Sequence, residues 1–210
     1  MSLIEKNTIH CIDCMDGLRE MPDNYIDLAI VDPPYGIGED GGKFRDRTGG
    51  GYRVHPKKSW DNYRPEAVYF SELLRVSRNS IVWGAIYFTD VLPVSRGWVY
   101  WDKKMGGDFG DGDMAWTSFN CVVRSFSFCN KYHGQIHPTQ KPADLYKWLL
   151  QNYAKEGDLI LDTHMGSGSS YIACLDMGFD YIGYEIDADY FTAIEKRVYD
   201  FTRQTNFFEV

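Results

Sequence analysis

The tetrapeptide Asp32-Pro33-Pro34-Tyr35 carries the first candidate chemistry in this chain. It follows the apolar run 26–31, which predicts a buried strand, so the carboxylate of Asp32 stands at a strand end. The two prolines fix φ at successive positions and offer no N–H, which leaves the nearby carbonyl groups free to accept hydrogen bonds. Two acceptors beside the ring of Tyr35 suit a planar heterocycle that carries an amino group. The plain alternative is a proline turn with a surface aspartate and a packing tyrosine.

A glycine loop between a strand and a helix carries the second candidate. The segment 159–170 reads Leu-Ile-Leu-Asp-Thr-His-Met-Gly-Ser-Gly-Ser-Ser, and an apolar helix follows from Tyr171. Such a loop lets a ligand approach the backbone closely near a helix N-terminus. It is not a Walker loop, because no lysine follows the glycines, and it lacks the Gly-x-Ser-x-Gly pattern of a nucleophile elbow. Glu185 ends the next apolar run, where nucleoside-binding folds hold ribose hydroxyls.

Strands that alternate with helices must position these residues. Apolar, β-branched runs predict strands at 8–12, 26–31, 80–83, 98–101, 121–128, 159–161 and 181–184. Helical spacing of apolar residues predicts helices around 67–74, 145–153 and 191–201. This alternation indicates an α/β fold with a mostly parallel sheet, in which ligands bind beyond the carboxyl ends of the strands.

The positive charge is confined to two blocks. The chain has 210 residues and a net charge of −8, yet residues 43–58 sum to +5 and residues 120–154 to +3. Phosphate binding needs only a local positive field, because salt screens charges beyond about 8–10 Å. The first block lies in a basic, glycine-rich stretch at 36–64, which has no periodicity and is expected to be a long loop. The net charge therefore does not exclude a nucleic-acid partner.

Five cysteines, an odd and irregularly spaced set, suit a reducing cytoplasm better than a disulfide framework. No secretion signal and no apolar run long enough for a membrane span is visible, so a soluble, cytoplasmic protein is expected without a membrane partner. The pair Cys11/Cys14 has metal-like spacing but lacks a partner pair, and the set Cys129/His133/His137 loses His137 to the segment 137–142, so we expect no metal.

Together the motifs resemble those of DNA amino-methyltransferases that use S-adenosylmethionine. Besides the two motifs above, the blocks His10-Cys11-Ile12-Asp13-Cys14, Leu18-Arg19-Glu20-Met21-Pro22-Asp23, Asp113-Met114-Ala115-Trp116-Thr117 and His137-Pro138-Thr139-Gln140-Lys141-Pro142 are similar to segments of that family. The tetrapeptide precedes the glycine loop, as in the circularly permuted β class. The resemblance implies a single domain over 1–210 with a Rossmann-like class I methyltransferase fold, a mostly parallel seven-stranded sheet and helices on both faces.

The resemblance also implies roles for individual residues. The catalytic set would be Asp32, Pro33, Pro34 and Tyr35, with the carboxylate of Asp32 and the carbonyl of Pro33 holding the target amine and Tyr35 stacking on the base. The cofactor set would be Asp13, Asp162, Gly166, Ser167, Gly168, Ser169, Glu185, Thr139 and Lys141. The DNA-binding set would be Lys43, Arg45, Arg47, Arg53, Lys57, Lys58, Arg124 and Lys131.

The implied reaction is methylation of the N6 amine of a flipped adenine in double-stranded DNA, as in restriction-modification. Adenine is favoured over cytosine N4 because the tetrapeptide begins with Asp; RNA methylation and an inactive nucleic-acid-binding relic are the alternatives. A homodimer is expected only because dimers are common in this class.

The chain departs from the family at two places. Thr163-His164 stands where the family usually has Pro-Phe, in the wall of the cofactor site. Residues 120–136 are the expected target-recognition segment, which is short for that task, so the basic stretch at 36–64 is expected to share it.

Overall fold

The computed structural model describes residues 2–46, 51–104, 110–129 and 135–206, with only the backbone of 43–46, 51–54 and 205–206. Its main sheet contains strands β1 (Thr8–His10), β10 (Asp180–Tyr184), β9 (Leu159–Asp162), β2 (Ile26–Val31), β5 (Ser77–Trp83), β7 (Gly112–Thr117), β6 (Trp98–Asp102) and β8 (Arg124–Ser127), in that spatial order. Within this sheet only β7 runs against its neighbours. The mostly parallel α/β fold is thus confirmed, and the sheet has eight strands rather than seven.

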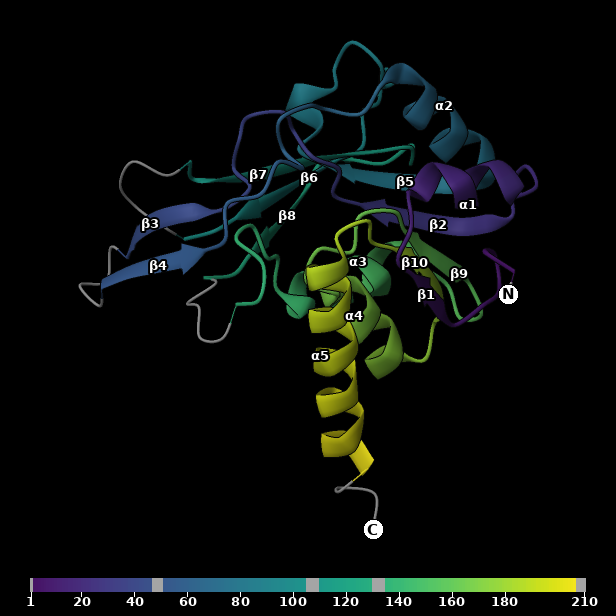
Figure 1. Cartoon of the computed structure of the whole chain (residues 1–210). Helices are drawn as coiled ribbons and strands as arrows, with labels where there is room; N and C mark the ends of the chain where they lie inside the picture. Colours follow the sequence, from purple (N-terminus) through teal and green to yellow (C-terminus); the bar gives the residue numbers. More distant parts are fainter. Residues whose placement is uncertain (1, 47–50, 105–109, 130–134, 207–210) are drawn as a thin grey trace.

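Helices cover both faces of the sheet (Figure 1). Helices α1 (Cys14–Glu20) and α2 (Ala67–Val76) lie on one face, and α3 (Ala143–Tyr153), α4 (Ser169–Met177) and α5 (Ala188–Asn206) on the other. A single 3₁₀ turn, η1, spans Ala85–Tyr87. The three longer helices α2, α3 and α5 fall where the spacing of apolar residues predicts them.

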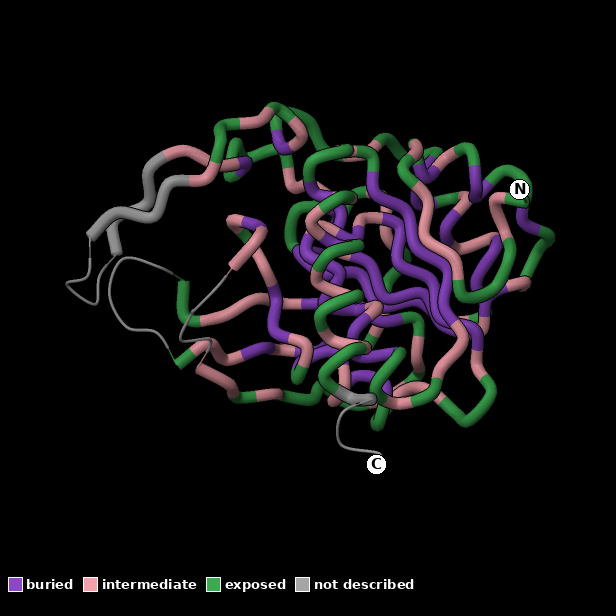
Figure 2. The backbone as a smooth tube through the Cα atoms, turned by 60° about the horizontal axis from the view of Figure 1, so that its bottom comes forward, coloured by how far each residue is buried: buried purple, intermediate pink, exposed green. Residues whose placement is uncertain are grey.

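The central strand β2 shows why two cores form. Side chains alternate across a strand, so Ala29 and Val31 pack with the α1/α2 core while Leu28 and Ile30 pack with the α3/α4/α5 core. Its burial on both faces accounts for the apolar run 28–31 in its sequence. Figure 2 shows the buried residues concentrated in these central strands.

The stretch 36–64 differs from the expected loop. It contains an antiparallel hairpin, β3 (Gly42–Asp46) paired with β4 (Gly51–His55), which projects from the body of the molecule (Figure 1). We call residues 36–64 the hairpin arm. Apolar residues alternate with polar ones at 44, 52 and 54 around a glycine-rich turn, and this is the period of a strand. The glycine-rich, basic composition of this stretch predicts a loop, and the alternation is too short to outweigh that prediction.

Three further elements differ from expectation. The strand predicted at 121–128 is limited to β8, Arg124–Ser127, while strand β7 and helix α1 are not among the predicted elements. Helix α1 has only seven residues, too few for its apolar spacing to be distinctive, and its start is set by Asp13, whose side chain accepts a hydrogen bond from Met15 N. In the described part of the chain, no helix combines the length and apolar character that a membrane crossing requires.

Candidate active site

The two sequence motifs meet at one edge of the sheet. Strands β2 and β9 are parallel neighbours, with Leu28 opposite Ile160 and Ala29 opposite Leu161. Their carboxyl ends therefore lie side by side, and these ends carry Asp32 and Asp162. Strand β10 pairs with β9 and ends immediately before Glu185. The edge brings the proline tetrapeptide, the glycine loop and the acidic strand end together, as the parallel arrangement predicts.

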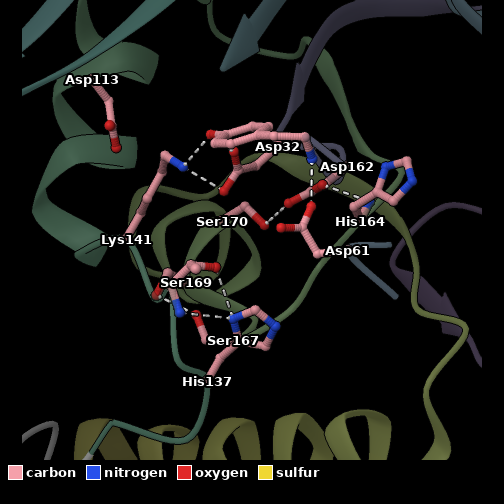
Figure 3. A network of polar contacts seen from close by, with 12 residues as sticks. Asp32, Asp61, Asp113, His137, Lys141, Asp162, His164, Ser167, Ser169 and Ser170 are labelled. Atoms are coloured by element: carbon pink, nitrogen blue, oxygen red, sulfur yellow. Dashed lines mark hydrogen bonds and ion pairs between the residues drawn. The ribbon is translucent and has the colours of Figure 1, made fainter. Parts of the chain in front are cut away.

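The carboxylate of Asp32 is held by two side chains. The hydroxyl of Tyr35 donates to its Oδ1 at 2.6 Å, and the ammonium of Lys141 forms an ion pair with its Oδ2. Lys141 also lies 3.3 Å from the Tyr35 hydroxyl, and its side chain is only 4% exposed. Figure 3 shows Lys141 directed at Asp32. Lys141 was expected in the cofactor set, whereas in the structure its ammonium is paired with the carboxylate of Asp32.

The ring of Tyr35 is fixed by its surroundings. It stacks on Tyr87 with 5.0 Å between ring centroids, and it lies against Gly84, where a Cβ would stand 2.0 Å from the ring. Burial, reinforced by the charge of Asp32, raises the pKa of Tyr35 well above its usual value. The hydroxyl therefore stays protonated and serves as a donor to Asp32.

Glu185 closes the glycine loop from the next strand. Its Oε2 accepts from Gly166 N at 2.8 Å and its Oε1 from Asp187 N at 2.9 Å. Gly166 and Gly168 have φ of 52° and 70°, a left-handed backbone that favours glycine. Burial raises the pKa of Glu185, a carboxylate that is 8% exposed.

Asp162 braces the same loop from inside the fold. It is 1% exposed, and it accepts hydrogen bonds from Ser170 Oγ at 2.5 Å and His164 N at 3.0 Å. Burial, with smaller contributions from Asp32 and Glu185, raises its pKa to about 7. Both oxygens therefore hold the loop, and the cofactor contact expected for Asp162 stays a prediction.

The serines of the loop are bound within the fold as well. The hydroxyls of Ser167 and Ser169 lie 3.0 Å apart, and Arg197 of α5 donates to Ser167 O at 2.7 Å and to Ser169 Oγ at 3.0 Å. Burial lowers the pKa of Arg197 from its usual value. The helix behind the loop thus stabilises its shape.

His137 covers the glycine loop from the other side. Its ring lies between Trp60 and Tyr190, with centroids 5.1 and 4.4 Å away, and a Cβ on Gly166 would stand 3.5 Å from its Nε2. Burial lowers the pKa of His137 to about 3, so the ring is neutral at physiological pH. Thr139 Oγ1 lies 3.2 Å from His137 Nδ1 and Thr139 is exposed, which places the His-Pro-Thr block beside the loop.

Thr163 and His164 form a polar wall where the family usually has Pro-Phe. The hydroxyl of Thr163 lies 2.6 Å from Tyr69 OH and 2.9 Å from His164 Nδ1. The ring of His164 packs edge-on against Tyr69, and burial lowers the pKa of His164 to about 4. Both residues are thus tied to α2, and the wall is neutral.

Asp13 lies at the same edge, beyond the end of β1. Glu185 N donates to His10 O at 3.0 Å, which brings the turn after β1 next to the end of β10. Asp13 is exposed, and its carboxylate caps the N-terminus of α1 by accepting a hydrogen bond from Met15 N. Its expected contact with the cofactor adenine stays a prediction.

The residues expected to contact DNA fall into three groups. The side chains of Lys43, Arg45 and Arg53, together with Arg47 and Lys131, lie outside the described residues. Arg124 is exposed on β8. Lys57 forms an ion pair with Asp40, and Lys58 forms ion pairs with Asp187 (2.9 Å) and Asp189 (2.6 Å). Lys57 and Lys58 are therefore paired with carboxylates of the same chain, whereas they were expected to bind DNA phosphates.

Asp61 belongs to the site and was not expected from the sequence. It is 2% exposed, and its carboxylate accepts backbone N–H groups from the chain that follows the proline tetrapeptide. Figure 3 shows it beside the Asp32 cluster. It stands in a polar stretch, where one aspartate among others gives no pattern that distinguishes it.

The arrangement suits an adenosyl cofactor. Two glycines in left-handed conformation open the backbone at the end of β9, and a buried carboxylate, Glu185, contacts that loop from the next strand. Carboxylates at this position of a doubly wound sheet bind ribose hydroxyls. A mostly parallel sheet with these groups at adjacent strand ends places the chain in the class of Rossmann-like nucleoside-binding folds.

Comparisons with known proteins agree with that class. The chain belongs to the N6/N4 DNA methylase family, whose profile matches residues 80–196, more than half of its length. The type II methyltransferase M.HpaI of Haemophilus parainfluenzae is 25% identical over an alignment 229 positions long, gaps included, which covers 90% of this chain and 73% of that protein. The resemblance inferred from the motifs is thereby confirmed.

Solved structures share the fold. The M1.HpyAVI–SAM complex has a TM-score of 0.63 and 17% identity, and the match covers 90% of this chain and 98% of the other. The cytosine-N4-specific PvuII DNA methyltransferase has a TM-score of 0.62 and 13% identity, with 95% and 92% covered. These likenesses show the Rossmann-like fold.

Proposed function

We propose that the chain transfers the methyl group of S-adenosylmethionine to the N6 amine of an adenine in double-stranded DNA. The observation that carries the proposal is the neighbouring placement of Asp32 at the end of β2 and the glycine loop at the end of β9. A donor at the loop and an amine at Asp32 then share one small pocket.

The cofactor supplies an electrophilic methyl group on a sulfonium. Gly166, Ser167 and Gly168 would hold its methionyl part, Glu185 would bind the ribose diol, and Asp13 would contact the adenine amine. The raised pKa of Glu185 means that this contact strengthens as the carboxylate ionises with rising pH. His137 and Thr139 bound the same pocket on its outer side.

Asp32 and the Pro33 carbonyl accept the two hydrogens of the target amine. These bonds draw the nitrogen toward tetrahedral geometry and localise its lone pair, which otherwise conjugates with the ring. The nitrogen–carbon bond would form as the carbon–sulfur bond breaks, and the thioether would leave as S-adenosylhomocysteine. The proton of the methylated nitrogen would pass to the Asp32 carboxylate that accepts its N–H, and from there to solvent. The acceptors stabilise the positive charge on nitrogen, so catalysis is positional and electrostatic.

The amine has to compete with Lys141 for Asp32. Lys141 neutralises the carboxylate in the free protein, and its ammonium also lies 5.4 Å from the Trp83 ring centroid. A target amine that binds Asp32 takes over acceptor positions that Lys141 now uses.

The target base has to leave the duplex, at a cost of a few kcal/mol of stacking and pairing. Tyr35 would stack on the flipped base, and its ring is supported by stacking on Tyr87. The proposal also assigns the chain to the permuted β class and gives it a role in restriction-modification. The exposed Arg124 would contact the DNA. The protein would act as a homodimer.

Transfer of tritiated methyl to unmethylated plasmid DNA tests the proposal. Nucleoside analysis should recover label in N6-methyl-2′-deoxyadenosine, and Asp32→Ala should lower the rate by about 10²–10³-fold or more while binding of S-adenosylhomocysteine persists. Label in N4-methylcytosine would replace adenine by cytosine as the target. A parallel reaction with RNA as substrate completes the test: label in RNA alone, or in neither substrate, would refute DNA methylation.

A further inference from the structure

Asp61 accepts four hydrogen bonds from the backbone between Tyr35, the last residue of the proline tetrapeptide, and Glu39. Its Oδ1 accepts from the N–H groups of Tyr35 (2.7 Å) and Gly36 (2.8 Å), and its Oδ2 from that of Glu39 (2.7 Å). Its carbonyl accepts a fourth bond, from Gly38 N at 3.0 Å. Hydrogen bonds to an ionised acceptor are about twice as strong as neutral ones.

The prolines give these bonds their importance. Neither Pro33 nor Pro34 has an N–H, so the first backbone donor after Asp32 is that of Tyr35, and it binds Asp61. The side-chain hydroxyl of the same tyrosine binds Asp32 at 2.6 Å. A continuous line of hydrogen bonds therefore runs from Asp61 through Tyr35 to the catalytic carboxylate.

Asp61 also stands where the hairpin arm returns to the body of the molecule. Gly36 and Arg64 face each other across the base of the arm, where a Cβ on Gly36 would stand 3.0 Å from Arg64 N. At the same base, Lys58 pairs with Asp187, whose N–H binds Glu185. The base of the arm thus contacts both the proline tetrapeptide and the acidic segment that follows β10.

We propose that Asp61 is a positioning residue for methyl transfer, which sets Tyr35, and through it Asp32, in the geometry that accepts the target amine. The inference rests on the proposed function. A carboxylate suits this position because its two oxygens accept three converging N–H groups while the aspartate itself is only 2% exposed.

Steady-state methylation of unmethylated plasmid DNA with tritiated S-adenosylmethionine tests the assignment. Asp61→Ala should lower kcat by about 10²-fold, the size of effect expected when catalytic groups shift by about 1 Å. KM for S-adenosylmethionine and the affinity for S-adenosylhomocysteine in calorimetry should stay within about twofold, because the contacts of Asp61 lie on the tetrapeptide side.

Asp61→Asn is the conservative rescue. Its one carbonyl oxygen still accepts from Tyr35 and Gly36 and loses only the bond from Glu39, so kcat should fall between wild type and Asp61→Ala. Asp180→Asn is the matched control: that aspartate pairs with Lys6 and Asn7 at the opposite end of β10, and the variant should keep wild-type kcat.

The outcomes are distinct. Unchanged kcat in Asp61→Ala, or a loss of cofactor affinity that parallels the loss of kcat, overturns the positioning role. Should Asp61→Ala not fold, Asp61→Asn decides: a lower kcat at unchanged KM supports the role, and wild-type kcat overturns it. No methyl transfer by the wild-type protein removes the proposed function and this inference with it, whereas an active wild type with an indifferent Asp61 removes the inference alone.

Discussion

Replacing Asp162 by asparagine should change how the stability of this protein depends on pH. Asp162 is almost fully buried behind the glycine loop, and burial raises its pKa from the ordinary 3.8 to about 7. Between these values the folded protein keeps the proton on Asp162 while the unfolded chain has lost it. Folding stability therefore falls as the pH rises through this window.

The magnitude follows from the shift. Three pKa units at 1.36 kcal/mol each give about 4 kcal/mol of stability lost between pH 4 and pH 7, as an upper figure. Asparagine has the same shape and no charge, and its oxygen still accepts the bond that His164 N donates. The variant and the wild type should thus be nearly equal at pH 4, and the variant should be more stable by several kcal/mol at pH 7.5.

Urea unfolding followed by circular dichroism, at half-unit steps from pH 4 to pH 8, measures the difference. The free-energy gap between Asp162→Asn and wild type should open by about 1.4 kcal/mol per pH unit and level off near pH 7. A gap that is independent of pH would refute the reasoning, because it would mean that Asp162 ionises equally readily in both states.

Two further perturbations address the pocket and the tyrosine. Glu185→Gln should weaken binding of S-adenosylhomocysteine in calorimetry by about 10–100-fold, the effect of losing a hydrogen bond to a charged partner; unchanged affinity would remove Glu185 from the cofactor site. Gly84→Ala should destabilise the fold by about 2–4 kcal/mol in urea unfolding, because it combines a left-handed backbone (φ 65°) with a Cβ that meets the Tyr35 ring. Gly178→Ala is its control, since that glycine has φ 74° and open space around it, so it should show the backbone effect only. Equal losses in the two variants would mean that the Tyr35 ring simply moves aside.

Local pattern was sufficient for the skeleton of the fold. Strand β2 falls on the predicted 26–31, and β9 and β10 lie within one residue of their predicted ends, because a strand buried on both faces leaves a continuous apolar run. The parallel alternation then placed Asp32 and Glu185 at the same edge. Short or polar elements escaped: α1 is seven residues long, and the hairpin arm carries its alternation within a basic, glycine-rich composition.

Contacts between distant segments escaped for a different reason. Lys141 lies 109 residues after Asp32, and Asp61 lies 26 residues after Tyr35 across the hairpin arm. Their residue types are ordinary, and their partners are backbone groups or charges that become neighbours only when strands and loops pack. The pairing of Lys57 and Lys58 with carboxylates, in place of a free basic surface, has the same origin.

The sequence by itself determined which side chains are available and which strand end each one follows, because backbone preference and apolar periodicity act over a few residues. Only the tertiary structure decided what those side chains touch. Ion pairs and hydrogen bonds act over about 3 Å, and the fold alone brings Lys141 and Asp61 within that range of the proline tetrapeptide.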